Sequence, residues 1–146
     1  MSVPKKISRT AVKYIMENDI AGDIIYDSTK VSRLHKELKT KLERVEDARD
    51  LFFVMLSSDT KEIEGIITIP ELKKILQKTP EKKITKADIN QNPSTINYKS
   101  SISVALDKFA DFNTNVILVT NENNRYMGKI KRSNFKDRLE EFLVSV

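Results

Sequence analysis

Two short segments of the sequence combine side chains that could bind an anion. In the first, Thr68 and Glu71 follow an apolar stretch that begins at Gly65. A Ser or Thr followed three residues later by Glu, directly before an apolar helical run, is typical of a capping box at a helix N-terminus. The N–H groups of a helix N-terminus can also bind a phosphate or carboxylate. The segment therefore allows two roles, helix capping and ligand contact, which do not exclude each other.

The second segment places basic and amide side chains at the equivalent point. Lys131 and Arg132 follow Gly128, and Asn134 comes two residues after Arg132. Lys and Arg make charge-assisted hydrogen bonds to phosphate, and an Asn side chain both donates and accepts hydrogen bonds. Exposed basic residues are also ordinary on protein surfaces. The pattern leaves open a phosphate site and a solvated basic surface.

Patterns typical of catalysis or metal binding are absent from the sequence. There is no cysteine, which excludes thiol catalysis, disulfides and cysteine-ligated metal sites, and the single histidine, His35, has no neighbouring set of ligands. There is no Gly-rich phosphate loop, no Gly-x-Ser-x-Gly motif and no spaced pair of carboxylates in apolar sequence. We therefore expect a protein that is not an enzyme and has neither a metal site nor an obligatory cofactor.

Alternating helical and extended patterns must position the two segments. Short apolar runs bounded by polar residues predict strands, and apolar residues spaced three and four apart predict helices. The expected strands are 24–26, 51–56, 63–67, 95–97, 116–119 and 126–130, and the expected helices are 7–15, 31–45, 71–76, 102–109 and 135–143. The polar segment 77–86, in which Pro80 disfavours a helix, is expected to be a linker.

The second half of this pattern repeats the first. Gly65 aligns with Gly128, and the apolar residues of the helices that follow them align as well, so each half has the order β-α-β-β-α. A unit of about sixty residues buries only ~60% of its unfolded surface and is marginal alone. We therefore expect an α/β fold (α+β type) of two repeats packed with pseudo-twofold symmetry. Residues 1–80 would form the first repeat with an N-terminal helix, and residues 81–146 the second.

The composition is that of a globular protein. Hydrophobic residues make up 39% and charged residues 32% of the 146, which suffices for a core. The longest apolar run, residues 51–56, is far shorter than the ~20 residues that span a membrane. No apolar signal segment follows the basic N-terminus. We expect a cytoplasmic protein with no membrane segment.

The net charge of +5 favours anionic partners. Lys and Arg mostly alternate with Asp and Glu, and only residues 125–138 are locally basic. This stretch allows three interpretations: a solvated surface, a site for a small anion, and a nucleic-acid interface. The nucleic-acid interface is the least expected, because no Gly-Phe-rich aromatic motif accompanies the charges.

Taken together, these residues resemble a tandem pair of cystathionine-β-synthase (CBS) domains, known as a Bateman module, over about residues 11–142. The family's signature is a strand-to-helix corner with Gly, two mostly apolar residues, Ser or Thr, two variable residues, Asp, and an apolar residue. Residues 65–72 (Gly-Ile-Ile-Thr-Ile-Pro-Glu-Leu) and 128–135 (Gly-Lys-Ile-Lys-Arg-Ser-Asn-Phe) match it. The departures are Glu71 and Asn134 in place of Asp, and Lys131 in place of the hydroxyl residue.

The resemblance implies a regulatory module that binds an adenine nucleotide (AMP, ADP, ATP or S-adenosylmethionine) in the cleft between the repeats. It further implies a homodimer that signals to an effector protein by conformational change. Carried over by position, the ligand-binding residues would be Thr68 and Glu71; Lys131, Arg132 and Asn134; Ser94, Thr95 and Ile96; and Asp23, Ile24 and Ile25. The alternative is an interaction or dimerisation module that binds no ligand.

Overall fold

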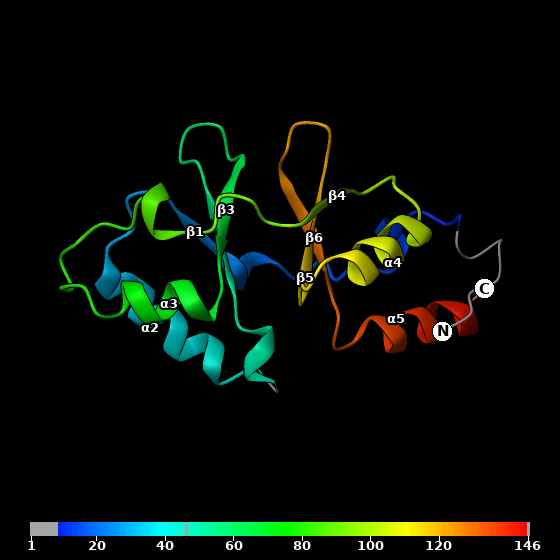
Figure 1. Cartoon of the computed structure of the whole chain (residues 1–146), viewed down its shortest axis with the longest axis horizontal. Coiled ribbons are helices and arrows are strands. Elements are labelled where there is room, and N and C mark those ends of the chain that lie inside the picture. The colour runs from blue at the N-terminus through cyan, green and yellow to red at the C-terminus, as the bar shows by residue number, and fades with distance from the viewer. Residues whose placement is uncertain (1–8, 46, 146) are drawn as a thin grey trace. The chain divides into compact units, whose positions relative to one another are not determined.

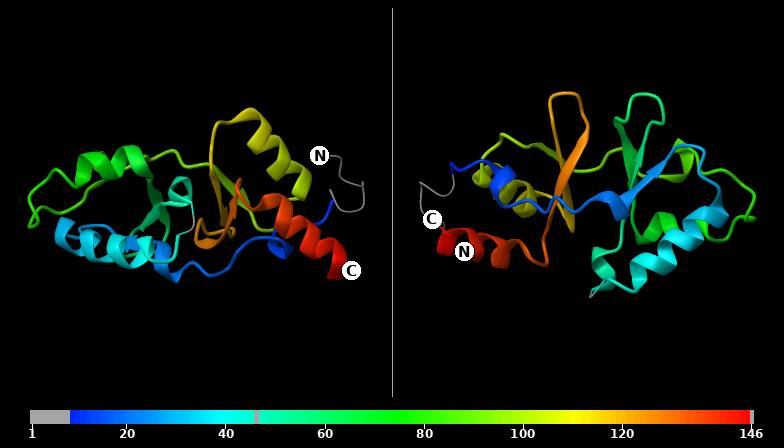
Figure 2. Two further views of the ribbon diagram at one scale, coloured as in Figure 1. Left: turned by 90° about the horizontal axis from the view of Figure 1, so that it is seen from below. Right: turned by 180° about the vertical axis from the view of Figure 1, so that it is seen from behind.

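The computed structural model describes residues 9–45 and 47–145, which form two compact units (Figure 1). The continuous unit consists of residues 20–93. The split unit combines residues 94–145 with residues 9–19, whose path can be followed in blue in Figure 2. These bounds differ from the predicted 1–80 and 81–146, because residues 9–19 pack with the second repeat and residues 81–93 with the first.

The continuous unit is a three-stranded sheet with two helices packed on one face. Its strands are β1 (Ile24–Tyr26), β2 (Phe53–Leu56) and β3 (Ile63–Ile67), its helices are α2 (Val31–Leu42) and α3 (Ile69–Ile75), and its 3-10 helices are η2 (Ala21–Asp23), η3 (Ala48–Asp50) and η4 (Lys86–Asp88). β2 lies between β1, to which it is parallel, and β3, to which it is antiparallel. Phe53, Met55 and Ile67 of the sheet form the core with Leu34 of α2 and Ile75 of α3.

The split unit repeats this arrangement. Its strands are β4 (Thr95–Asn97), β5 (Val116–Thr120) and β6 (Tyr126–Lys131), its helices are α4 (Ile102–Asp111) and α5 (Phe135–Ser145), and residues 9–19 contribute the 3-10 helix η1 (Val12–Tyr14). β5 is parallel to β4 and antiparallel to β6. Ile117 and Ile130 of the sheet pack with Phe109 of α4 and Leu139 of α5. The α/β class and the duplicated β-α-β-β-α order are therefore confirmed.

The helix predicted at 7–15 is wrong for its described part. Residues 12–14 form one 3-10 turn, and residues 7 and 8 lie outside the described residues. The N–H groups of Val12 and Lys13 donate to the carbonyls of Ser100 and Tyr98, at 2.7 and 3.2 Å. Backbone groups that are bonded to another segment cannot continue a helix. The apolar spacing instead reflects the burial of Val12 and Ile15 in the core of the split unit.

The linker predicted at 77–86 is also wrong, because this segment is part of the continuous unit. Ile84 is fully buried, and its N–H donates to the carbonyl of Thr29 at 2.8 Å. Near the start of the segment, Lys78 pairs with Asp88, which lies just beyond its end, at 2.7 Å. Burial acts to raise the pKa of Asp88, but the hydrogen bonds from Lys78 and from the backbone of Thr85 outweigh it and lower that pKa below its ordinary value.

Each of the two aligned glycines lies where another segment approaches closely. In the continuous unit, Asn90 pairs with Ile66 in an isolated antiparallel bridge, and a Cβ on Gly65 would lie 2.4 Å from the Asn90 carbonyl oxygen. In the split unit, Glu17 pairs with Lys129, and a Cβ on Gly128 would lie 2.8 Å from the Glu17 carbonyl oxygen. Close approach of a second segment therefore leaves no room for a side chain at either glycine.

Candidate functional site

The first corner, between β3 and α3, is a closed capping box. Thr68 is the N-cap of α3, and Glu71 is its third residue. The Thr68 N–H and hydroxyl both donate to Glu71 Oε1, at 2.8 and 2.6 Å. The capping role predicted from the Thr-x-x-Glu pattern is therefore confirmed. The contact of Thr68 and Glu71 with a ligand stays a prediction.

Replacing Thr68 by alanine is expected to lower the free energy of unfolding by about 1 kcal/mol, because the N-cap hydroxyl is lost. Urea denaturation measures the change. Thr79→Ala is the matched control, since Thr79 is an exposed threonine of the same unit that bonds through its main-chain carbonyl. If Thr68→Ala lowered the free energy of unfolding no more than Thr79→Ala does, the capping role would be contradicted. If a ligand still stabilises Thr68→Ala as much as the original chain, capping is the only role of this hydroxyl.

The second corner, between β6 and α5, brings two of its predicted residues onto one carboxylate. Lys131 Nζ lies 3.5 Å from Glu17 Oε2, with the two side chains 22% and 20% exposed. The Asn134 side-chain amide donates to Glu17 Oε1. Lys131 and Asn134 therefore meet an anionic group, as their residue types suggested. Sequence reasoning missed Glu17, because it lies 117 residues from Asn134 and no local pattern joins the two.

Arg132, although adjacent to Lys131, has different partners. Its Nε donates to the Thr114 carbonyl at 2.9 Å, and its Nη2 donates to the carbonyls of Phe109 and Phe112 at 2.7 and 3.0 Å. The guanidinium carbon also lies 5.0 Å from the centre of the Phe109 ring. A basic side chain on these carbonyls caps the C-terminus of α4. The structure does not bring Arg132 to the carboxylate held by Lys131 and Asn134.

The predicted residues near β1 have partners within the continuous unit. Asp23 is buried and forms an ion pair with Lys41, whose Nζ lies 2.7 Å from Asp23 Oδ1. Lys41 also donates to the carbonyl of Phe52. Ile24 is half-buried and pairs with Val54, and Ile25 belongs to the core.

The equivalent residues near β4 follow the same pattern. The Ser94 carbonyl accepts the N–H of Leu118 at 2.9 Å. Thr95 is half-buried and pairs with Leu118, while Ile96 lies in the core of the split unit. Ser94 and Thr95 thus leave partly exposed hydroxyl side chains at the start of this strand.

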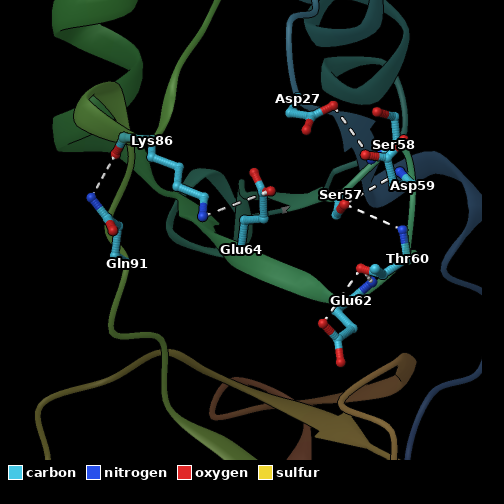
Figure 3. Close-up of polar contacts among 9 residues, drawn as sticks. All are labelled: Asp27, Ser57, Ser58, Asp59, Thr60, Glu62, Glu64, Lys86 and Gln91. Atoms are coloured by element: carbon cyan, nitrogen blue, oxygen red, sulfur yellow. Dashed lines mark hydrogen bonds and ion pairs between the residues drawn. The ribbon is translucent and has the colours of Figure 1, made fainter.

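Figure 3 shows a further polar group of the continuous unit that the sequence did not single out. In the turn after β2, Ser57 Oγ accepts the N–H groups of Asp59 and Thr60, each at 3.3 Å. On β3, Glu64 Oε1 lies 4.0 Å from Lys86 Nζ, and Glu64 Oε2 is buried without a hydrogen-bond partner. The turn contacts stabilise the hairpin itself, whereas Glu64 keeps one acceptor unused.

No group of three or more His, Asp or Glu side chains in 9–45 and 47–145 is placed to hold a metal ion. Over the same residues, no helix is both long and apolar enough to cross a membrane.

No family model and no curated protein matches the sequence, but solved structures match the fold. A CBS domain-containing protein of unknown function from Bacillus anthracis superposes with a TM-score of 0.72 and 16% identity, over 94% of this chain and 99% of that one. The CBS domains of a transcriptional regulator from Streptococcus pneumoniae superpose with a TM-score of 0.68 and 11% identity, over 87% and 97%.

The chain has the fold of a CBS-domain pair.

A third neighbour is the cytosolic domain of the Mg²⁺ channel MgtE, solved in complex with ATP. It superposes with a TM-score of 0.63 and 14% identity over 87% of this chain. This chain spans about half of some neighbours, namely 52% of the MgtE domain and 48% of the soluble part of a magnesium transporter. Its two glycine-led corners, β3–α3 and β6–α5, are the features that first indicated the resemblance.

Proposed function

We propose that this CBS pair is a regulatory module that binds an adenine nucleotide and signals to an effector protein by conformational change. The observation that carries the proposal is the second corner, where Lys131 and Asn134 both meet one carboxylate. A cation and an amide N–H that converge on an anionic oxygen pair are also suited to a phosphate. The fold adds support, because a neighbour of this fold was solved in complex with ATP.

The contacts within each unit rank the proposed ligand residues. Lys131 is a better candidate for the phosphate than Arg132, whose guanidinium already serves three carbonyls. Asp23 can offer a ligand only main-chain groups while its carboxylate pairs with Lys41. Thr68 and Glu71 bond to each other, so a ribose hydroxyl would add to the capping box or replace part of it.

Thermal unfolding with AMP, ADP, ATP and S-adenosylmethionine tests the proposal. A ligand at a hundredfold excess over its dissociation constant is expected to add ~2.7 kcal/mol of stability. Lys131→Ala is expected to weaken binding of ADP and ATP more than binding of adenosine, because it removes a phosphate contact. Lys136→Ala is the matched control, since Lys136 is an exposed lysine of the next helix. If Lys131→Ala and Lys136→Ala lost equal affinity for ADP and ATP, Lys131 would be excluded from the phosphate site.

A second candidate function is an interaction module that binds no ligand and forms a homodimer. It is favoured by the intramolecular partners of Arg132, Thr68 and Asp23. If no adenine ligand stabilises the protein while sedimentation shows a dimer, this candidate replaces the first. A nucleic-acid interface is less favoured, because Arg132 and Arg138 of the basic stretch bind carbonyls of the split unit.

A further inference from the structure

The carboxylate of Glu17 occupies the place at the second corner that an anionic ligand would need. Its two oxygens face Lys131 Nζ, at 3.5 Å, and the side-chain amide of Asn134. A phosphate and a carboxylate cannot both lie against the same ammonium group without strong repulsion between them. A ligand that uses Lys131 and Asn134 must therefore first displace the Glu17 side chain.

The backbone of residues 15–17 is fixed to the corner independently of the carboxylate. The N–H and carbonyl of Glu17 bond to the carbonyl and N–H of Lys129, at 2.8 and 2.9 Å. Arg138 of α5 donates to the carbonyls of Ile15 and Met16, at 3.0 and 2.7 Å. None of these bonds involves the Glu17 side chain, which is 20% exposed.

The first corner has no such carboxylate on the segment that bridges it. Asn90 takes the place of Glu17 there, because it forms the bridge to Ile66 as Glu17 does to Lys129. Asn90 is neutral, and its Oδ1 accepts the N–H of Asn92 at 2.9 Å. A bridging backbone segment is thus common to both units. The bridging residue is acidic at the second corner, where it is Glu17, and neutral at the first, where it is Asn90.

From this arrangement we infer that Glu17 is a built-in competitor for the anionic ligand of the second corner, an inference that rests on the proposed function of Lys131 and Asn134. The apparent affinity for the ligand equals the affinity of the open corner multiplied by the fraction of molecules in which the Glu17 carboxylate is displaced. Nucleotides with more phosphate charge compete with Glu17 more effectively than those with less. The second corner then favours highly charged ligands over weakly charged ones.

Binding of ATP, adenosine and inorganic tripolyphosphate to Glu17→Gln, measured by titration calorimetry, tests this inference. Glu17→Gln is expected to raise the affinity for ATP and tripolyphosphate by roughly tenfold, which corresponds to a corner closed in about nine of ten molecules. Affinity for adenosine is expected to stay unchanged. Asp19→Asn is the matched control, because it removes an exposed carboxylate two residues away. Glu17→Ser repeats the test with a shorter neutral side chain if Glu17→Gln does not fold.

The outcomes separate this inference from the proposed function. If ATP binds the original chain and Glu17→Gln equally well, the inference is overturned and the nucleotide site stands. If tripolyphosphate binds Glu17→Gln more tightly than the original chain but no adenine ligand binds either, the inference stands and the adenine ligand is excluded. If no probe binds any variant, both are overturned.

Discussion

Asp23→Ala is expected to lower the free energy of unfolding by about 3–5 kcal/mol, because it leaves Lys41 as a buried cation without its carboxylate partner. The Asp23 and Lys41 side chains are only 4% and 11% exposed, and their charged atoms lie 2.7 Å apart. Lys41 Nζ also lies 4.6 Å from the centres of both the Phe52 and Phe53 rings. The pair therefore joins the end of α2 to the start of β1 inside the continuous unit. Equilibrium urea denaturation measures the loss.

Two control variants test whether the loss of stability comes from the unpaired buried charge. The double variant Asp23→Leu with Lys41→Met removes both charges and is expected to cost less than Asp23→Ala alone, since no unpaired buried charge remains. Glu81→Ala breaks an exposed ion pair, in which the side chains of Glu81 and Lys30 are 79% and 52% exposed. It is expected to lower the free energy of unfolding by less than about 1 kcal/mol. An Asp23→Ala effect as small as that of Glu81→Ala would show that burial of the pair has no energetic consequence.

Gly65→Ala is expected to lower the free energy of unfolding by about 3 kcal/mol, at the upper end of the usual cost of overpacking. The new Cβ would lie 2.4 Å from the Asn90 carbonyl oxygen and 2.7 Å from Ile89 Cδ1. The Asn90 carbonyl accepts the N–H of Ile66 at 2.9 Å, so it cannot move away without losing this bridge. Urea denaturation and amide exchange at Ile66 measure the two consequences.

The other two glycines complete the comparison. At Gly128 the nearest atom to a new Cβ is Met16 Sδ, at 2.6 Å, and a flexible side chain can move; however, the Glu17 carbonyl oxygen at 2.8 Å cannot move freely. At Gly22 no heavy atom lies within 4 Å, so Gly22→Ala is expected to change stability by less than about 0.5 kcal/mol. If Gly65→Ala and Gly22→Ala were equally stable, close approach would not explain the aligned glycine.

The sequence predicted those features that depend on nearby residues. The apolar run in β2 and the helical spacing in α4 specify their own secondary structure. The capping box of Thr68 and Glu71 needs only four consecutive residues. The alignment of Gly65 with Gly128 identified two equivalent positions, although it did not reveal which segments approach the two glycines.

The features that the sequence did not predict depend on contacts between distant residues. Apolar residues in 7–15 have helical spacing, but the N–H groups of Val12 and Lys13 bond to the carbonyls of Ser100 and Tyr98. Ile84 is one apolar residue in a polar segment, and its burial depends on the backbone of Thr29. The carboxylate partner of Lys131 and the amine partner of Asp23 likewise come from other elements. Single-sequence patterns contain no information on such pairings.

The division of the chain has a consequence for how the protein folds during synthesis. Residues 20–93 form a contiguous unit, so all the segments that pack within this unit are present once it has left the ribosome. Residues 9–19 are made earlier, but their partners in 94–145 are made only after the whole continuous unit. Residues 9–19 can therefore join their own unit only after the continuous unit has been made, and contacts of such high sequence separation form slowly.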